Sequence, residues 1–185
     1  MTDQHVQPSL ATDRLELRAF SPVDAADVAR LCGDREIAAG TLTIPHPYPP
    51  SAATEWISRQ PERFASGAGA NFAVVERETG VLTGSVGLVF EEEHKRAELG
   101  YWVGVPHWGR GYATEAVRPV IRYGFEERGL NRIYAYHFSN NPASGRVMQK
   151  VGMTYEGVRR QHTLKWGEFL DNEGYGILRD EWSAA

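Results

Sequence analysis

The sequence predicts a mixed α/β fold, in which a central, largely antiparallel sheet contains one parallel pair of strands joined by a crossover helix. Three β-rich runs, 71–77, 81–90 and 98–105, follow one another with short turns between them, which is typical of an antiparallel meander. Apolar residues at helical spacing then continue over 113–128, and another β-rich run covers 131–138. A strand, a helix and a strand in this order require a parallel pair with a crossover.

The segment before the meander contributes a strand and a helix. Residues 1–11 show no clear periodicity, and we expect a loose terminus there. Apolar and charged residues alternate over 14–19, a period of two that predicts a first strand. Ser21 and Pro22 are a typical start of a helix, which we expect to end near Gly33.

Two further regions complete the predicted elements. The proline-rich segment 44–50 is an extended loop, either a pocket wall or a rigid connector, and Ser51 begins a second helix that reaches Phe64. After the central region, we expect a helix over 142–150 that ends at Gly152, and a closing hairpin over 153–164 and 173–178 with its turn at Trp166 and Gly167.

Composition limits the classes of protein. With 185 residues, 42% of them hydrophobic and 24% charged, the chain fits one globular domain over 1–185. The net charge is −4 and Lys and Arg form no long run, so we expect no nucleic-acid partner. Cys32 is the only cysteine and the six histidines form no compact ligand set, so we expect neither a disulfide nor a metal. Without a signal peptide or an apolar run of roughly 18 to 20 residues, a cytoplasmic protein without a membrane partner is expected.

The stretch VPHWGRGYATEA, residues 105–116, places a glycine-rich loop between a strand and the N-terminus of the long helix. Unpaired N–H groups and the helix dipole attract anions at such a point, so a phosphate is the expected ligand. Gly109 and Gly111 allow close approach, and Arg110 either adds positive charge or faces solvent. The loop also resembles a truncated dinucleotide fingerprint, but that motif follows the first strand of a parallel sheet, whereas antiparallel strands precede it here. A dinucleotide-dependent oxidoreductase is therefore a minor alternative.

Several motifs in order resemble the GNAT superfamily of acyl-CoA-dependent N-acyltransferases, and within it the RimJ/RimL type named for ribosomal-protein N-terminal acetyltransferases. The motifs are DRLELRAFSPVDAADV, IPHPYP, ELGYWVGVPHWGRGYATEA, NPASGRVMQKVGM and YGILRDEW. The resemblance implies a GNAT fold whose parallel strands splay apart to admit acetyl-CoA. It also makes a homodimer conceivable, although no interface is legible in the sequence.

The resemblance further implies the cofactor-binding residues. The pyrophosphate loop falls on Trp108, Gly109, Arg110, Gly111, Tyr112 and Ala113, where Trp108 departs from the usual Gln or Arg but can act through its backbone. The strand end at Trp102, Val103, Gly104 and Val105 would hold the pantetheine arm, with Asn141 close to that arm. An N–H group near Val103 would polarise the thioester carbonyl.

Acyl transfer to an amine requires a neutral amine, a stabilised oxyanion and a proton for the departing thiolate. Many relatives donate that proton from a tyrosine at the position of Met148, and a methionine has no proton to donate. The resemblance offers the hydroxyl of Ser144 instead. The alternative is that Ser144 only hydrogen-bonds within the first turn of its helix. Glu98 is a candidate base, or else a surface carboxylate, and His137 is a second candidate base, or else a structural histidine. Neither a G-x-S-x-G elbow nor an activated thiol indicates an acyl-enzyme, so direct attack is expected.

These observations predict an N-acetyltransferase that moves the acetyl group of acetyl-CoA to a primary amine. The resemblance favours the α-amine at the N-terminus of a protein or peptide. A small amine such as a polyamine, an amino acid or an antibiotic is the first alternative, and a non-catalytic acyl-CoA sensor is the second. Tyr48 and Trp102 are candidates for contact with the acceptor.

Overall fold

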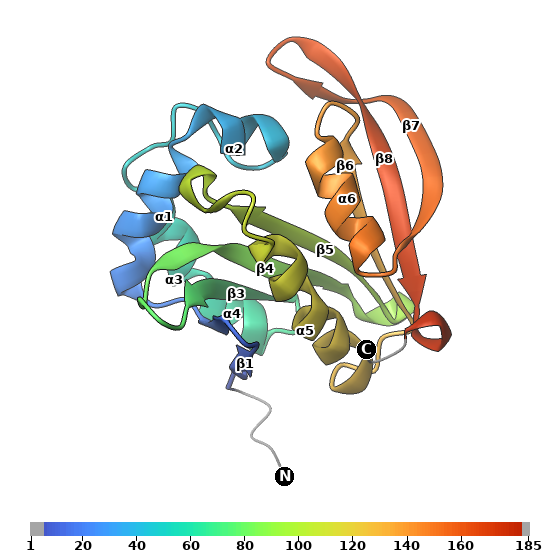
Figure 1. The fold of residues 1–185 in the computed structure, drawn as a ribbon, viewed down its shortest axis with the longest axis horizontal. Coiled ribbons are helices and arrows are strands. Elements are labelled where there is room, and N and C mark those ends of the chain that lie inside the picture. Colours follow the sequence, from blue (N-terminus) through green and yellow to red (C-terminus); the bar gives the residue numbers. More distant parts are fainter. Residues whose placement is uncertain (1–5, 183–185) are drawn as a thin grey trace.

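A computed structural model describes residues 6–182, and its strands form a single eight-stranded sheet (Figure 1). The strands are β1 (Leu10–Ala11), β2 (Leu15–Ala19), β3 (Gly69–Glu76), β4 (Leu82–Glu91), β5 (Arg96–Val103), β6 (Arg132–Phe138), β7 (Thr154–Lys165) and β8 (Glu168–Leu178). Their order across the sheet is β1-β2-β3-β4-β5-β6-β8-β7. β5 and β6 pair in parallel and the other neighbours pair antiparallel, which confirms the predicted fold class.

Helices cover both faces of the sheet (Figure 1). They are α1 (Ala25–Cys32), α2 (Arg35–Gly40), α3 (Ala52–Ser58), α4 (Gln60–Ala65), α5 (Tyr112–Glu126) and α6 (Pro142–Lys150). Short 3-10 turns occur at Pro22–Asp24, Glu92–His94, Val105–His107 and Arg179–Glu181. Phe72 points into the core beneath α5 and its neighbour Ala73 into the core beneath α1 and α3, because successive strand residues point to opposite faces. The meander therefore carries one apolar layer on each side.

The parallel pair opens after a short contact. β5 and β6 are in register from Arg96–Arg132 to Glu98–Tyr134, and β5 then continues to Val103 without a partner on that edge. Figure 1 shows the two arms meeting near the C-terminal end of α5 and diverging toward α2 and the tip of the β7–β8 hairpin. The crossover that joins them contains α5, as predicted, so the splayed strand pair is confirmed.

The N-terminal segment differs from its expectation. Leu10 and Ala11 pair with β2, Leu10 packs against the main core, and the Gln7 side chain donates to the carbonyl of Asn71 at 2.9 Å. The prediction of a loose terminus over 1–11 is therefore wrong for the part of this segment that lies next to β2 and β3. Residues 1–5 of that prediction lie outside the described part of the chain.

Two helix predictions also needed correction. The helix expected from Ser51 to Phe64 is split into α3 and α4, because Pro61 has no N–H with which to continue the ladder of α3. α2 was not predicted; its six residues are too few to show a helical period.

The closing hairpin has the predicted turn and a longer second strand. Trp166 and Gly167 have φ values of 50° and 86°, as a tight two-residue hairpin turn requires. β8 begins at Glu168 rather than at residue 173, because the two-residue turn places Glu168 and Phe169 directly opposite Lys165 and Leu164 of β7.

Candidate active site

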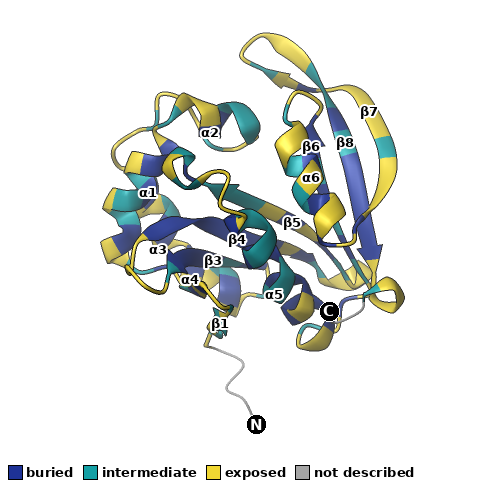
Figure 2. Cartoon of the chain, in the orientation of Figure 1, coloured by how far each residue is buried: buried dark blue, intermediate teal, exposed yellow. Residues whose placement is uncertain are grey.

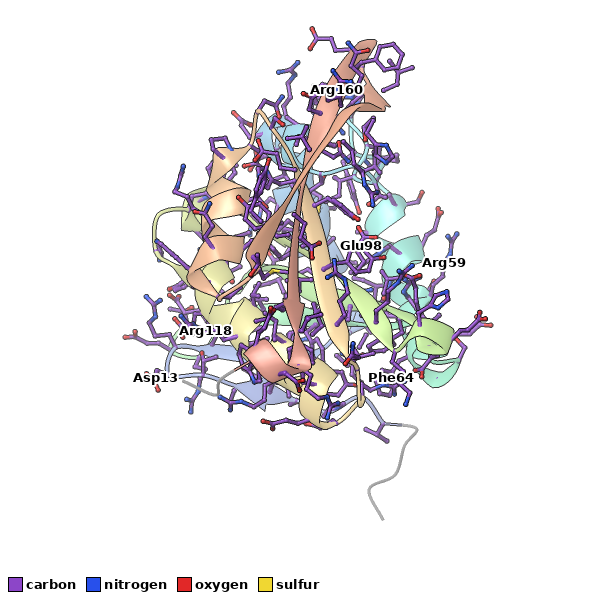
Figure 3. All side chains as sticks on the ribbon, turned by 90° about the vertical axis from the view of Figure 1, so that its right-hand side faces the viewer. Asp13, Arg59, Phe64, Glu98, Arg118 and Arg160 are labelled. Atoms are coloured by element: carbon purple, nitrogen blue, oxygen red, sulfur yellow. The ribbon has the colours of Figure 1, made fainter. Side chains whose placement is uncertain are left out.

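The opening between β5 and β6 is the floor of a large cleft. The cleft has a volume of about 1400 Å³, and its walls come from the segment 40–48, α3, α4, the splayed strands and the β7–β8 hairpin. Figure 3 shows Glu98 on the side of the sheet that faces Arg59, whereas Arg118 of α5 lies on the other side. The opening thus connects two faces, one bounded by α5 and α6 and one by α3 and α4.

The end of β5 presents to this opening backbone groups that are not paired with β6. Gly104 N–H donates to the carbonyl of Thr83 on β4 at 2.8 Å. Because successive strand residues direct their N–H and C=O groups to opposite edges, the groups of Val103 face the opening and those of Trp102 face β4. Trp102 therefore reaches the cleft through its side chain. The Val103 carbonyl accepts from the indole N–H of Trp108 at 2.5 Å, and its N–H is directed at the opening.

The loop that follows is shaped to receive an anion. Gly109 and Gly111 have φ values of 75° and 81°, a left-handed conformation that favours glycine, and no atom lies within 4 Å of a Cβ built at Gly109. Gly111 is also the N-cap of α5 and offers no side-chain cap, so the N–H groups of the first helical turn are open. Figure 2 shows the loop before α5 exposed. These features fit the pyrophosphate of a coenzyme A thioester.

A distant arginine holds this loop in place. The Arg14 guanidinium donates to the Arg110 carbonyl at 3.0 Å and to the Glu115 carboxylate at 2.8 Å. The Arg110 guanidinium itself lies 3.8 Å from Glu76, and the buried Tyr112 donates its hydroxyl to the same carboxylate. Tyr112 therefore contributes its backbone to the loop. Sequence reasoning missed Arg14, because 96 residues separate it from Arg110 and no local pattern marks the contact.

The first turn of α6 carries the predicted serine. Asn141 is the N-cap, and its side-chain oxygen accepts the N–H of Ser144 at 3.4 Å. Ser144 Oγ lies 2.8 Å from the hydroxyl oxygen of Tyr101, and the same phenol oxygen lies 2.9 Å from the Ser144 carbonyl. Met148 is 1% exposed, within the core. Sequence reasoning missed Tyr101, for which the position on the splayed strand was the only available indication.

Glu98 faces the cleft as a carboxylate without a cation bonded to it. Its neighbours are paired: Arg96 contacts Glu91 at 2.6 Å, and Arg132 contacts Glu156. Within residues 6–182 the Glu98 side chain forms no ion pair and no hydrogen bond. Reduced hydration in the cleft raises the pKa of Glu98, the charge of Glu91 raises it further, and Arg159 opposes the shift. Such a carboxylate accepts a proton more readily than an ordinary surface Glu.

His137 is enclosed under α6. Its side chain is 3% exposed, and Nδ1 lies 2.8 Å from the carbonyl of Phe138. Among the described residues Nε2 has no hydrogen-bond partner. It lies 3.8 Å from Glu173, and Gly145 of α6 packs against this part of the ring. This placement favours a structural role over proton transfer.

The acceptor side of the cleft contains the predicted aromatic residues and the single cysteine. Tyr48 and Trp102 both pack against the core that includes Cys32. Burial raises the pKa of Tyr48 to about 12 and that of Cys32 to about 12. A protonated thiol is a poor nucleophile, which supports direct transfer without an acyl-enzyme.

Comparison with known proteins identifies the family of this chain. Residues 14–154 match the acetyltransferase (GNAT) domain family, and the chain belongs to that family. The uncharacterized N-acetyltransferase YoaA of Bacillus subtilis is 32% identical over 173 residues, which cover 93% of this chain and 97% of YoaA. The protein is an acetyl-CoA-dependent acetyltransferase that acts on an amine.

Solved structures share the fold over nearly the whole chain. A GNAT-family acetyltransferase from Bacillus anthracis has a TM-score of 0.82 at 26% identity and covers 94% of this chain and 99% of its own. RimL, the ribosomal L7/L12 α-N-protein acetyltransferase in complex with coenzyme A, has a TM-score of 0.86 at 16% identity and covers 94% and 99%. The second likeness is one of fold alone.

Two further findings concern partners of other kinds. Among the described residues, no His, Cys, Asp and Glu side chains gather in a group of three that could hold a metal ion. No helix in the same part of the chain has the length and apolar character needed to cross a membrane.

Proposed function

We propose that the enzyme transfers the acetyl group of acetyl-CoA to the α-amine at the N-terminus of a protein or peptide, by direct attack within a ternary complex. The observation that carries this proposal is the charge balance of the large acceptor cleft. Its lining contains the carboxylates of Glu55, Glu62 and Glu98 and the guanidinium groups of Arg59, Arg63 and Arg159. A polyamine would be held best by an acidic lining, whereas a peptide terminus has one cationic group followed by neutral backbone.

In this proposal each site residue has one role. The N–H of Val103 stabilises the oxyanion that forms on the thioester carbonyl. Glu98, unpaired and with a raised pKa, takes a proton from the attacking amine directly or through water. Ser144 hydrogen-bonds the departing thiolate.

The test is a thiol-release assay with acetyl-CoA and three matched acceptors: a short peptide, the same peptide with a blocked N-terminus, and spermidine. We expect turnover of the free peptide and none of the blocked one. Glu98→Gln should lower kcat by about 10², while the exposed Glu93→Gln serves as a control and keeps the wild-type rate. Turnover of spermidine alone would overturn the acceptor assignment.

A further inference from the structure

One side chain bridges the opening of the sheet and has no role in the mechanism above. Tyr101 lies on β5 beyond Glu98, where pairing with β6 has ended. It packs against the core that contains Met148, and its hydroxyl reaches the first turn of α6 at Ser144. A phenol therefore connects the strand whose backbone faces the opening to the helix that borders it.

The two contacts of the Tyr101 hydroxyl control where the proton of Ser144 points. The phenol oxygen lies 2.9 Å from the Ser144 carbonyl and 2.8 Å from Ser144 Oγ, and it has one proton to donate. If the carbonyl receives that proton, the serine hydroxyl donates to Tyr101 and is held there. If Oγ receives it, the serine proton is free for a third group. A negative charge in the opening favours the second arrangement, because it accepts that proton.

The surroundings keep Tyr101 in the form that can donate. Burial raises the pKa of Tyr101, because removal from water disfavours the phenolate, and this effect exceeds the opposing one of the hydrogen bond to Ser144. The phenol is therefore neutral at the pH at which the enzyme would work. Met148, one turn after Ser144 on the same face of α6, has no proton to offer.

We propose that Tyr101 is a positioning residue for the departure of coenzyme A: it donates to Ser144 Oγ, so that Ser144 donates to the sulfur. This inference rests on the proposed acetyl transfer in this cleft. As the C–S bond breaks, its electron pair passes to sulfur, and the Ser144 hydroxyl stabilises the thiolate by a hydrogen bond. Neither hydroxyl loses its proton, because an alkoxide is much less stable than a thiolate. The proton that the thiol finally carries is equivalent to the one that the amine released to Glu98 and solvent.

The first test needs no acceptor. The thiol of bound coenzyme A is titrated through the ultraviolet absorbance of its thiolate in the wild type, Tyr101→Phe and Ser144→Ala. We expect the bound thiol to be more acidic than free coenzyme A in the wild type, and about tenfold less acidic in each variant than in the wild type. Tyr175→Phe is the matched control: it removes a buried phenol that accepts from Gln149 at 3.1 Å, and it should leave the thiol unchanged.

The second test separates positioning from structural support. Tyr101→Phe should lower kcat about tenfold with the KM for acetyl-CoA within about twofold, and adding Tyr101→Phe to Ser144→Ala should cause no further loss. The unfolding temperatures of Tyr101→Phe and Tyr175→Phe are compared with that of the wild type, so that a general loss of structure is detected separately. An unchanged thiol titration in Tyr101→Phe, or additive losses in the double variant, would overturn the inference. If the thiol titration shows the expected differences between the wild type and the two variants but no peptide is acetylated in the thiol-release assay, the proposed acceptor is refuted and the role of Tyr101 stands.

Discussion

Replacement of Gly145 by alanine tests how closely α6 is held against the sheet. A Cβ at this position would lie 3.1 Å from Cε1 of His137 and 2.6 Å from Nε2, and the second distance is about 1 Å shorter than an ordinary contact. The ring cannot retreat easily, since its Nδ1 is bonded to the carbonyl of Phe138 and the ring of Tyr175 lies beside it, tilted by 31°, with ring centroids 5.7 Å apart. Overpacking costs about 1–3 kcal/mol, and alanine recovers about 1 kcal/mol of helix propensity.

With the ring held on two sides we expect the net destabilisation of Gly145→Ala to be about 1–2 kcal/mol, which lowers Tm by roughly 2–8 °C for a chain of this length. Activity should fall further than this loss implies, because an outward shift of α6 lengthens the contact between Ser144 and Tyr101. Thermal unfolding and thiol release are the assays. The double variant with His137→Ala should be less destabilised than the sum of the single variants. A Gly145→Ala protein that melts at or above the wild-type Tm would refute the steric argument.

Three further outcomes follow from the site. Gly111→Ala introduces left-handed strain of about 1–2 kcal/mol in the loop and should weaken acetyl-CoA binding, measured by calorimetry, by roughly 5- to 30-fold. Gly129→Ala is the control: Gly129 also has a positive φ, 67°, with open space around it, and its replacement should leave acetyl-CoA binding unchanged. Arg14→Ala should weaken the same binding severalfold, because it frees the carbonyl of Arg110; unchanged affinity would show that the loop holds its shape alone. The third outcome concerns the pH dependence of the ratio between the wild-type rate and the rate of Glu98→Gln. This ratio should rise with pH through the raised pKa of Glu98 and then level off, because the carboxylate must be ionised to accept a proton, whereas the ionisation of the amine affects both enzymes equally. A ratio that does not change with pH would exclude Glu98 as the base.

The features predicted correctly from the sequence depend on residues close together in the chain. The alternation over 14–19, the β-rich runs of the meander, the apolar stripe of α5 and the turn at Trp166 and Gly167 are local patterns, and all are present in the structure. The loop before α5 is local as well, since a strand end, two glycines with positive φ and a helix N-terminus follow one another directly; anion binding by this loop stays a prediction. The splay of β5 and β6 could be expected only from the family resemblance, because the place where pairing stops leaves no mark in either strand.

The sequence by itself determined the fold class, the acetyltransferase family and the loop suited to the pyrophosphate, because periodicity and turn chemistry act over a few residues. The tertiary structure decided what each side chain meets: Arg14 reaches Arg110, Tyr101 reaches Ser144 across the opening, and the ring of His137 is enclosed beneath Gly145. These contacts join segments that lie far apart in the chain or on different elements. They depend on the direction in which each strand and helix presents its side chains, and that direction is established only when the sheet, α5 and α6 pack together.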